Sequence, residues 1–328
     1  MRDNHNRPIN YLRLAVTDRC NLRCFYCMPE EGIQFTQRQA LLTYEELLRL
    51  IALMAPLGIS KVRITGGEPF LRKDLMGFIT ALAKIPGIRS IPITTNGTLT
   101  RRYLDELVAL GIQSFNLSID SLDQKRFYHI TRRDYLEEVL ACMHEMIDRK
   151  LDVKLNAVVM KGKNIEDIWP MIALTEHQAI SVRFIEEMPF NGGKKEPVSL
   201  EWNYLKILDH ISQAYPQIEK LPDPPNSTSL NYQVKGFKGS FGIIPAYSRS
   251  FCGTCNRLRL TPQGVLKTCL YDQGVFSLRD LMRSGATDAQ LVQAIVEAVG
   301  HRAKNGFEAE QRHRESGRAF ESMASIGG

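Results

Sequence analysis

Apolar runs of strand length alternate with amphipathic stretches of helical length along the first two-thirds of the chain. The strand-like runs are residues 11–16, 61–65, 91–95, 114–119, 153–159 and 182–185. Apolar positions at helical spacing fill the intervals at residues 43–55, 75–83, 101–110, 136–149 and 165–175. Thr43, followed three residues later by Glu46, predicts a capped start for the first of these helices. Such alternation predicts an α/β fold with a parallel sheet.

The number of strand–helix units leaves two architectures open. Six units are present rather than eight, which fits either a doubly wound open sheet or an incomplete barrel. Residues 190–197 then form a loop rich in Gly and Lys, 200–214 have a helical pattern, and 221–226 have the composition of a linker. We therefore expect two domains, residues 1–220 and a smaller α+β domain at residues 221–328.

Charge and composition restrict the function only a little. The 328 residues carry a formal net charge of +6, which suits an anionic ligand but is too diffuse to indicate nucleic-acid binding. No run of 18 apolar residues is present, so no membrane span is expected. Residues 1–10 are polar and lack the apolar region of a signal peptide. We expect a cytoplasmic protein in which thiols stay reduced.

Three of the seven cysteines lie directly after the first strand-like run. Cys20, Cys24 and Cys27 have the spacing C-x3-C-x2-C, at which thiolates can converge on one metal centre. A structural zinc ion needs four protein ligands, and no fourth Cys or His follows within the next hundred residues. Three cysteines on a four-iron cluster would leave one iron open to a ligand.

A second group of three cysteines follows near the C-terminus. Cys252, Cys255 and Cys269 have the spacing C-x2-C-x13-C, and the next histidine, His301, is distant. Three ligands are again present and a fourth is missing, which indicates a second cluster. The segment Arg257–Leu258–Arg259 has the alternation of a strand, so both guanidinium groups project to one face, where they could bind phosphate. Cys142 lies in a helical pattern and is interpreted as a packing residue.

The first cysteine group, with an aromatic residue before its last cysteine, resembles the radical S-adenosylmethionine (radical SAM) superfamily. A Gly66–Gly67–Glu68–Pro69 turn after the second strand resembles the same superfamily. The resemblance implies an incomplete six-stranded (βα)6 TIM-like barrel and a 4Fe-4S cluster that reductively cleaves S-adenosyl-L-methionine. The cofactor contacts that it implies are Tyr26, Gly67, Ser118 and Met188.

The two cysteine groups together, with C-x-x-C-x-R-x-R and a Gly–Gly pair at 327–328, resemble more narrowly the GTP 3′,8-cyclases, the molybdenum cofactor biosynthesis protein A family. This implies a lyase with two 4Fe-4S clusters that cyclises GTP to (8S)-3′,8-cyclo-7,8-dihydroguanosine 5′-triphosphate, the first step of molybdenum cofactor biosynthesis. By the same resemblance, the second cluster binds the guanine and Gly327 and Gly328 enter the active site. The implied GTP contacts are Arg13, Arg63, Thr94, Lys154, Arg257, Leu258 and Arg259.

The resemblance also implies partners. They are a reductase or flavodoxin-type electron donor and a downstream cyclic pyranopterin phosphate synthase, and a homodimer is compatible with it. Two alternatives stay open at this point: another radical SAM enzyme with an auxiliary cluster, such as a peptide-modifying one, and a zinc-stabilised nucleic-acid-binding protein.

Overall fold

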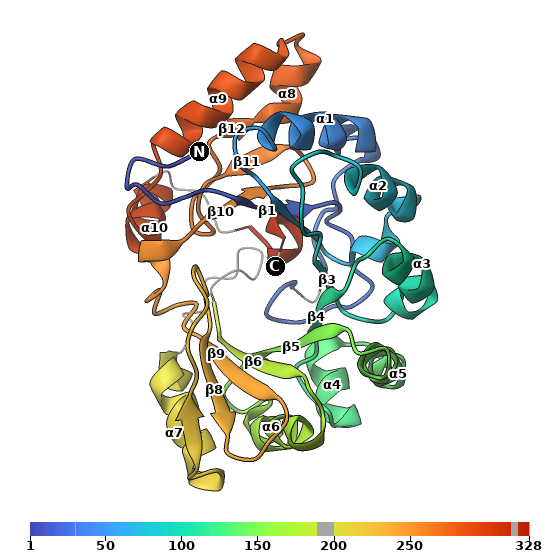
Figure 1. Ribbon diagram of the computed structural model, residues 1–328, viewed down its shortest axis with the longest axis vertical. Helices are drawn as coiled ribbons and strands as arrows, with labels where there is room; N and C mark the ends of the chain where they lie inside the picture. Colours follow the sequence, from blue (N-terminus) through green and yellow to red (C-terminus); the bar gives the residue numbers. More distant parts are fainter. Residues whose placement is uncertain (30, 189–199, 316–320, 328) are drawn as a thin grey trace.

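The computed structural model describes residues 1–29, 31–188, 200–315 and 321–327. Its twelve-stranded sheet has the order β12-β11-β10-β1-β2-β3-β4-β5-β6-β9-β8-β7. The sheet curves around a central space, and helices cover its outer side (Figure 1).

The first six strands confirm the partial barrel. β1 (Tyr11–Ala15), β2 (Lys61–Thr65), β3 (Ile93–Thr95), β4 (Ser114–Ser118), β5 (Asp152–Val159) and β6 (Ser181–Glu186) pair in parallel, each with the next along the chain. The order never reverses, as it would at the switch point of a doubly wound sheet. An unbroken parallel order suits a sheet that closes on itself, as in the (βα) barrels.

The connecting helices agree with the sequence pattern apart from one addition. They are α1 (Tyr44–Met54), α2 (Leu75–Leu82), α3 (Leu104–Ala109), α4 (Gln124–Thr131), α5 (Leu136–Asp148) and α6 (Ile168–His177). The capping box predicted at Thr43 and Glu46 is present at the start of α1. Helix α4 was not predicted because it is short and buries only Phe127, Ile130 and Thr131. Short 3-10 helices span Arg38–Ala40, Pro69–Leu71, Thr100–Tyr103, Ile165–Asp167, Leu200–Trp202 and Cys252–Thr254.

The C-terminal strands extend the same sheet at both of its edges. β9 (Ser240–Ile244) pairs in parallel with β6, and β10 (Arg257–Leu260) pairs in parallel with β1. The remaining elements are α7 (Tyr204–Ala214), β7 (Ile218–Lys220), β8 (Leu230–Val234), β11 (Val265–Lys267), β12 (Phe276–Ser277), α8 (Leu278–Arg283), α9 (Asp288–Gly300), α10 (Gly306–Glu315) and α11 (Met323–Ile326). The boundary placed at residue 220 stays a prediction, since the strands on both sides of it share one sheet.

Strand alternation decides which side chains face the central space. Leu12 pairs in register with Val62 and Leu258, and all three are fully buried in the core under the helices. Arg13 pairs in register with Arg63 and Arg259, one residue further along each strand. Because successive side chains of a strand point to opposite faces, these arginines face inward. Among the described residues, no helix is long and apolar enough to cross a membrane.

Candidate active site

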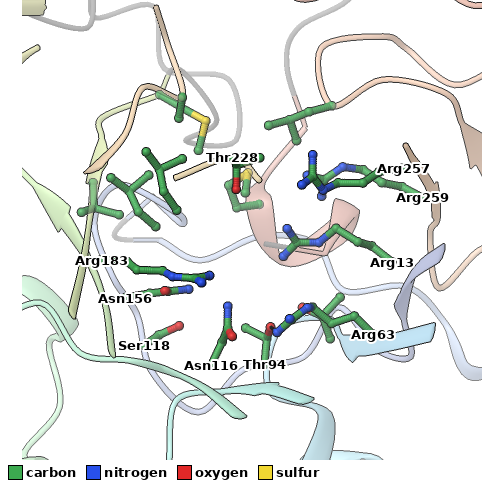
Figure 2. A pocket seen from close by; sticks show the side chains of 18 of the residues that line it. Arg13, Arg63, Thr94, Asn116, Ser118, Asn156, Arg183, Thr228, Arg257 and Arg259 are labelled. Atoms are coloured by element: carbon green, nitrogen blue, oxygen red, sulfur yellow. Dashed lines mark hydrogen bonds between the residues drawn. The ribbon is translucent and has the colours of Figure 1, made fainter. Parts of the chain in front are cut away.

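The concave side of the sheet holds a cavity of about 510 Å³, within the range of about 300–1,000 Å³ usual for small-molecule sites. Both cysteine groups line this one cavity, together with side chains from β1 to β6 and β10. Figure 2 shows arginines from opposite walls pointing into it. The topology therefore brings together residues as far apart on the chain as Tyr11 and Ala324.

Five arginines point into the cavity: Arg13, Arg63, Arg183, Arg257 and Arg259. Lys61 and Arg249 also line it. Burial lowers the pKa of Arg13 well below its usual range, and the neighbouring Arg259 lowers it further. Burial and Arg63 lower the pKa of Arg183 to about 10, and burial and Arg257 lower that of Arg259. These lowered pKa values mean that holding the charged guanidinium groups buried and close together costs free energy. A polyanion in the cavity would relieve that cost.

Hydrogen bonds position part of this lining. Arg63 Nε donates to the Tyr11 hydroxyl at 2.5 Å, and its Nη1 donates to Thr94 Oγ1 at 3.2 Å. Burial alone would raise the pKa of Tyr11, but Arg63 and Arg13 outweigh it and lower the pKa to about 8. Arg257 Nη2 donates to the Asn226 carbonyl at 2.7 Å. Arg63 and Thr94, two of the predicted GTP contacts, are therefore hydrogen-bonded to each other at the cavity wall.

The opposite wall carries uncharged polar groups that the sequence analysis missed. Asn116 lies in register with Thr94, and Asn156 lies in register with both Ser118 and Arg183. The Oδ1 atoms of Asn116 and Asn156 and the Nε of Arg183 are buried and have no hydrogen-bond partner in the described structure. The signal that identifies all three is strand register with Thr94 and Ser118, which the structure shows and the sequence does not. A nucleoside would satisfy such donors and acceptors.

Residues 221–226 have the composition of a linker, but the loop at 224–228, which overlaps them, lines the cavity. Thr228 points into it in Figure 2, and the Asn226 carbonyl is bound to Arg257. Its Pro- and Asn-rich composition gives no signal of this role, because the contact depends on β10 lying across the sheet from β8.

The first cysteine group occupies the loop after β1. The Tyr26 hydroxyl donates to Asp120 Oδ2 at 2.8 Å, and Asn96 Nδ2 lies 3.7 Å from Cys20 Sγ. Burial raises the pKa of Asp120 to about 6. Burial, followed by the charge of Glu68, raises the pKa of the Cys20 thiol to about 12. Tyr26, Gly67, Ser118 and Met188, the four predicted S-adenosylmethionine contacts, all line the cavity beside this loop.

The Gly66–Gly67 turn packs tightly against that loop. A Cβ on Gly67 would lie 2.3 Å from the Arg19 carbonyl oxygen, and the Gly67 amide donates to the Thr17 carbonyl at 2.8 Å. Glycine is therefore required here by the chain's own backbone, whether or not a ligand also approaches. The adjacent Glu68 is fully buried and accepts from Phe70, Thr95 and Asn96.

The second cysteine group lies across the cavity beside β10 and β11. The Gly306 amide lies 3.4 Å from Cys252 Sγ, and Arg302 Nη2 lies 3.6 Å from Cys255 Sγ. Burial would raise the pKa of Cys255, but Arg257 and Arg302 outweigh it and lower it. For Cys269, burial and Asp272 raise the pKa to about 12.

The geometry of both groups suits clusters. Throughout the part of the chain that the structure describes, no three Cys, His, Asp or Glu side chains lie close enough to bind one metal ion. Burial is the first cause raising the pKa of Cys24 and of Cys269, and thiols of the same group raise both further. All three cysteines of each group line the same cavity. A 4Fe-4S cluster binds each cysteine through a different iron, so its sulfurs lie further apart than the ligands of one zinc ion. The residues present fit two such clusters.

Three predicted residues lie elsewhere. Lys154 does not line the cavity and its Nζ contacts the Asp152 carboxylate. Leu258 is fully buried in the core, on the face of β10 away from the cavity, so its side chain cannot contact a ligand there. Cys142 is fully buried in α5, which confirms its packing role. Gly327 is described, and its carbonyl accepts from Arg259 Nη1. Gly328 lies outside the described residues.

Comparisons with known proteins agree with this site. Residues 14–175 match the model of the Radical SAM superfamily, and residues 180–308 match Molybdenum Cofactor Synthesis C. The chain is 38% identical, over 100% of both lengths, to a GTP 3′,8-cyclase of Thermodesulfovibrio yellowstonii. It is 42% identical to human molybdenum cofactor biosynthesis protein 1 over 92% of this chain and 48% of that protein.

The first mammalian relatives are thus about twice as long as the part that the chain matches. Among solved structures, Streptococcus suis SuiB is similar with a TM-score of 0.61 and 14% identity, covering 92% of this chain and 72% of that chain. At this identity the likeness shows the fold alone. The full-length match, joined to both domain matches, shows that the chain belongs to the GTP 3′,8-cyclase family within the radical SAM superfamily.

Proposed function

We propose that the chain cyclises GTP to (8S)-3′,8-cyclo-7,8-dihydroguanosine 5′-triphosphate as the first step of molybdenum cofactor biosynthesis. The observation that carries the proposal is the cavity itself, in which two three-cysteine groups face each other beside five inward arginines. Family membership and the full-length likeness to a GTP 3′,8-cyclase support it.

Each part of the cavity then has a role. Cys20, Cys24 and Cys27 would hold a cluster that binds S-adenosylmethionine, and Cys252, Cys255 and Cys269 would hold a second one beside the guanine. When bound, the first cluster would supply the reductive chemistry that generates a carbon radical.

The chain's own residues bind and orient the nucleotide. Arg13, Arg257 and Arg259 lie on adjacent strands and suit the triphosphate, since guanidinium groups pair with phosphate through two parallel hydrogen bonds. Asn116 and Asn156 present unpartnered amide oxygens on the opposite wall, which suits hydroxyl or amino donors of the nucleoside. The sheet surrounds the cavity on several sides, so it would limit the access of water and hold the ribose C3′ and guanine C8 in a fixed orientation.

The test is anaerobic reconstitution with iron, sulfide, S-adenosylmethionine and GTP, followed by mass analysis of the nucleotide product. Cyclised nucleotide, together with 5′-deoxyadenosine, is the expected result. The Arg257→Ala/Arg259→Ala double variant should bind GTP at least about ten-fold more weakly, because each lost hydrogen bond to a charged group is worth about 1.5–3 kcal/mol. Peptide modification instead of nucleotide cyclisation, or protein that carries zinc rather than iron, would contradict the proposal.

The electron donor and the consumer of the product belong to the same proposal. A reductase or flavodoxin-type carrier would supply electrons, and a cyclic pyranopterin phosphate synthase would take the cyclised nucleotide. The reaction class requires both, because radical generation consumes an electron and the product still has to be converted to a pterin.

A further inference from the structure

The N-terminal segment is fastened to the second cysteine group by a buried ion-pair network. Asp3, Arg7 and Arg302 have side chains that are 0%, 6% and 3% exposed, and Asp3 Oδ2 accepts from Arg7 Nε at 2.7 Å and from Arg302 Nη1 at 3.0 Å. The network joins residues separated by 299 positions. Burying three charges costs free energy of folding unless their geometry is well defined, so we expect the network to have a function beyond stability.

The guanidinium of Arg302 holds the Cys255 region at several points. Its Nη1 donates to the Cys255 carbonyl at 3.2 Å, and its Nη2 contacts Cys255 Sγ at 3.6 Å and the Arg257 carbonyl at 3.2 Å. Its Nε donates to the Thr268 carbonyl, next to Cys269, at 3.1 Å. Arg7 completes the frame, since its Nη1 donates to the Cys252 carbonyl at 3.1 Å. One charged frame thus contacts the backbone at or beside all three cysteines.

The first cysteine group differs from the second at its sulfurs, although both groups have a cation and a carboxylate nearby: Arg23 donates to the Cys20 carbonyl, and Asp272 accepts from the Cys269 amide. The groups that contact the sulfurs of the first group are neutral, namely Asn96 Nδ2 at 3.7 Å from Cys20 Sγ and Ser322 Oγ at 3.8 Å from Cys27 Sγ. Its buried charged neighbours are carboxylates, Glu68 at 0% and Asp120 at 4% exposure. The potential of an iron–sulfur cluster depends on nearby charge and on hydrogen bonds to sulfur. Positive charge stabilises the reduced state, which is more negative, and negative charge opposes it.

We propose that Arg302, oriented by Asp3, is a positioning residue that sets the reduction potential of the second cluster above that of the first. The proposal rests on the proposed function, since it requires a cluster at Cys252, Cys255 and Cys269. Its consequence is that an electron entering the enzyme at equilibrium resides on the second cluster, while S-adenosylmethionine cleavage depends on the more strongly reducing first cluster.

The experiment is a potentiometric titration of the reconstituted full chain, followed by electron paramagnetic resonance. Signals are assigned to each cluster with Cys24→Ala, which removes a ligand of the first. In the unaltered protein the second cluster should have the higher midpoint potential. Arg302→Gln should shift the midpoint of the second cluster to a more negative value and leave the first unchanged. Arg279→Gln is the matched control, because its guanidinium also donates to a backbone carbonyl, that of Ala40, but contacts neither cysteine group.

Asp3→Asn separates orientation from charge. Removing a nearby negative charge would, by itself, shift the second midpoint to a more positive value. If Asp3 acts by holding Arg302 on Cys255, the shift is instead negative and in the same direction as in Arg302→Gln. If Arg302→Gln does not retain the second cluster, the midpoint potential of that cluster is measured in Arg302→Lys instead. This variant keeps the charge but cannot make the same fork of hydrogen bonds.

The outcomes are distinct. An unchanged second midpoint in Arg302→Gln, a positive shift in Asp3→Asn, or a lower second midpoint in the unaltered protein would each overturn the proposal while leaving the proposed function intact. Iron and sulfide sufficient for one cluster only, in the unaltered protein, would overturn the proposed function and this proposal with it.

Discussion

The guanidinium groups of the cavity are mutually repulsive in the structure as it stands. Burial lowers the pKa of Arg13, and Arg259, Arg63 and Arg257 lower it further. Burial and Arg63 likewise lower the pKa of Arg183. Charges buried in this way cost stability unless a counter-charge is present. The proposed triphosphate would supply that counter-charge where the arginines from β1, β2, β6 and β10 converge (Figure 2). At the residue scale, we therefore expect relief of this repulsion to contribute to GTP affinity.

Arg183→Gln tests this at a residue for which sequence analysis had no prediction. The substitution removes a positive charge that is half-buried in the wall opposite Arg257. GTP affinity should fall by roughly ten-fold, the effect of losing about 1.5 kcal/mol from one charged hydrogen bond. Calorimetric titration of the reconstituted protein with GTP gives the measurement, and Arg89→Gln, an exposed arginine outside the cavity, is the control. Equal affinity in Arg183→Gln would remove Arg183 from the site.

Strand register explains how much of the site could be predicted. Alternation within β10 places Arg257 and Arg259 on one face, and the sequence shows this without a structure. The pairing of β1 with β10, which only the structure shows, brings Arg13 beside Arg259. Register across neighbouring strands, which the sequence does not show, adds Asn116 and Asn156. Contacts such as that of Arg302 with Asp3 depend on packing between chain ends and have no local signal. The same reason explains why the composition of residues 221–226 indicated a linker, although residues 224–226 line the cavity.

At the scale of elements, turns and helix ends hold the loops that carry the cysteines. The Gly66–Gly67 turn after β2 packs against the backbone before Cys20, and helix α1 is joined to α8 by Glu46 and Arg283. Arg283 Nε and Nη2 donate to the two oxygens of Glu46 at 2.8 and 2.9 Å, so the pair is bidentate. The turn fixes the loop that leads into Cys20, and the ion pair fixes how α1 meets α8 of the C-terminal part.

Gly67→Ala should disrupt the first cysteine loop. The added Cβ would lie 2.3 Å from the Arg19 carbonyl oxygen, which is backbone and cannot move without shifting Cys20. We expect loss of S-adenosylmethionine cleavage by at least a hundred-fold, since displacement of about 1 Å can cost that much. The measurement is 5′-deoxyadenosine formation without GTP.

Gly77→Ala is the control, because no atom lies within 4 Å of a Cβ there and it sits inside α2. This substitution should raise the free energy of unfolding by about 1 kcal/mol and leave cleavage unchanged. Full activity in Gly67→Ala would contradict the role assigned to the turn.

The Glu46–Arg283 pair predicts a pH dependence of stability. The hydrogen bond from Arg283 is the first cause that lowers the pKa of Glu46 below its usual range. A lowered pKa in the folded state contributes stability above the unfolded value of about 4.3, and this is lost as the pH falls through the folded value. Because the pair is partly exposed, Glu46→Gln should cost about 1 kcal/mol or less at pH 7.

Glutamine can keep the capping-box hydrogen bond of Thr43, so the substitution isolates the charge. Urea unfolding at a series of pH values should show the difference between the two proteins shrinking below about pH 4. A difference that stays constant down to pH 3 would show that the ion pair is not its source.

At the scale of the whole molecule, segments remote in sequence complete the open side of the partial barrel. The loop at 224–228 meets β10 through Asn226 and Arg257, and the C-terminal helix α11 lies within the curve of the sheet (Figure 1). Ser322, the residue that caps α11, donates to the Cys27 carbonyl at 2.6 Å. Met323 and Ala324 line the cavity beside the first cysteine group. The sequence analysis expected Gly327 to enter the active site, and its contact with Arg259 supports that prediction.

Gly327→Ala should therefore separate radical generation from cyclisation. Gly327 has φ +76°, and an added Cβ would lie 2.8 Å from Thr65 Cγ2 and 3.2 Å from Ala15 Cβ, at the ends of β2 and β1. Relief of this clash must displace the Gly327 carbonyl from Arg259. The substrate would then lose part of its positioning, while the contacts of the cysteines stay unchanged. We expect 5′-deoxyadenosine to form at a rate within a few-fold of the unaltered protein, and cyclised nucleotide to fall by at least ten-fold, a loss of about 1.4 kcal/mol in positioning.

Gly285→Ala tests the effect of backbone strain alone. Gly285 also has a positive φ, of +91°, but no atom lies within 4 Å of an added Cβ. It lies after α8, away from the cavity. That variant should lose some stability and keep the ratio of the two products. Both products are measured in one reaction, so the ratio does not depend on how much protein carries clusters. An unchanged ratio in Gly327→Ala would mean that the C-terminal segment packs beside the site without positioning the substrate.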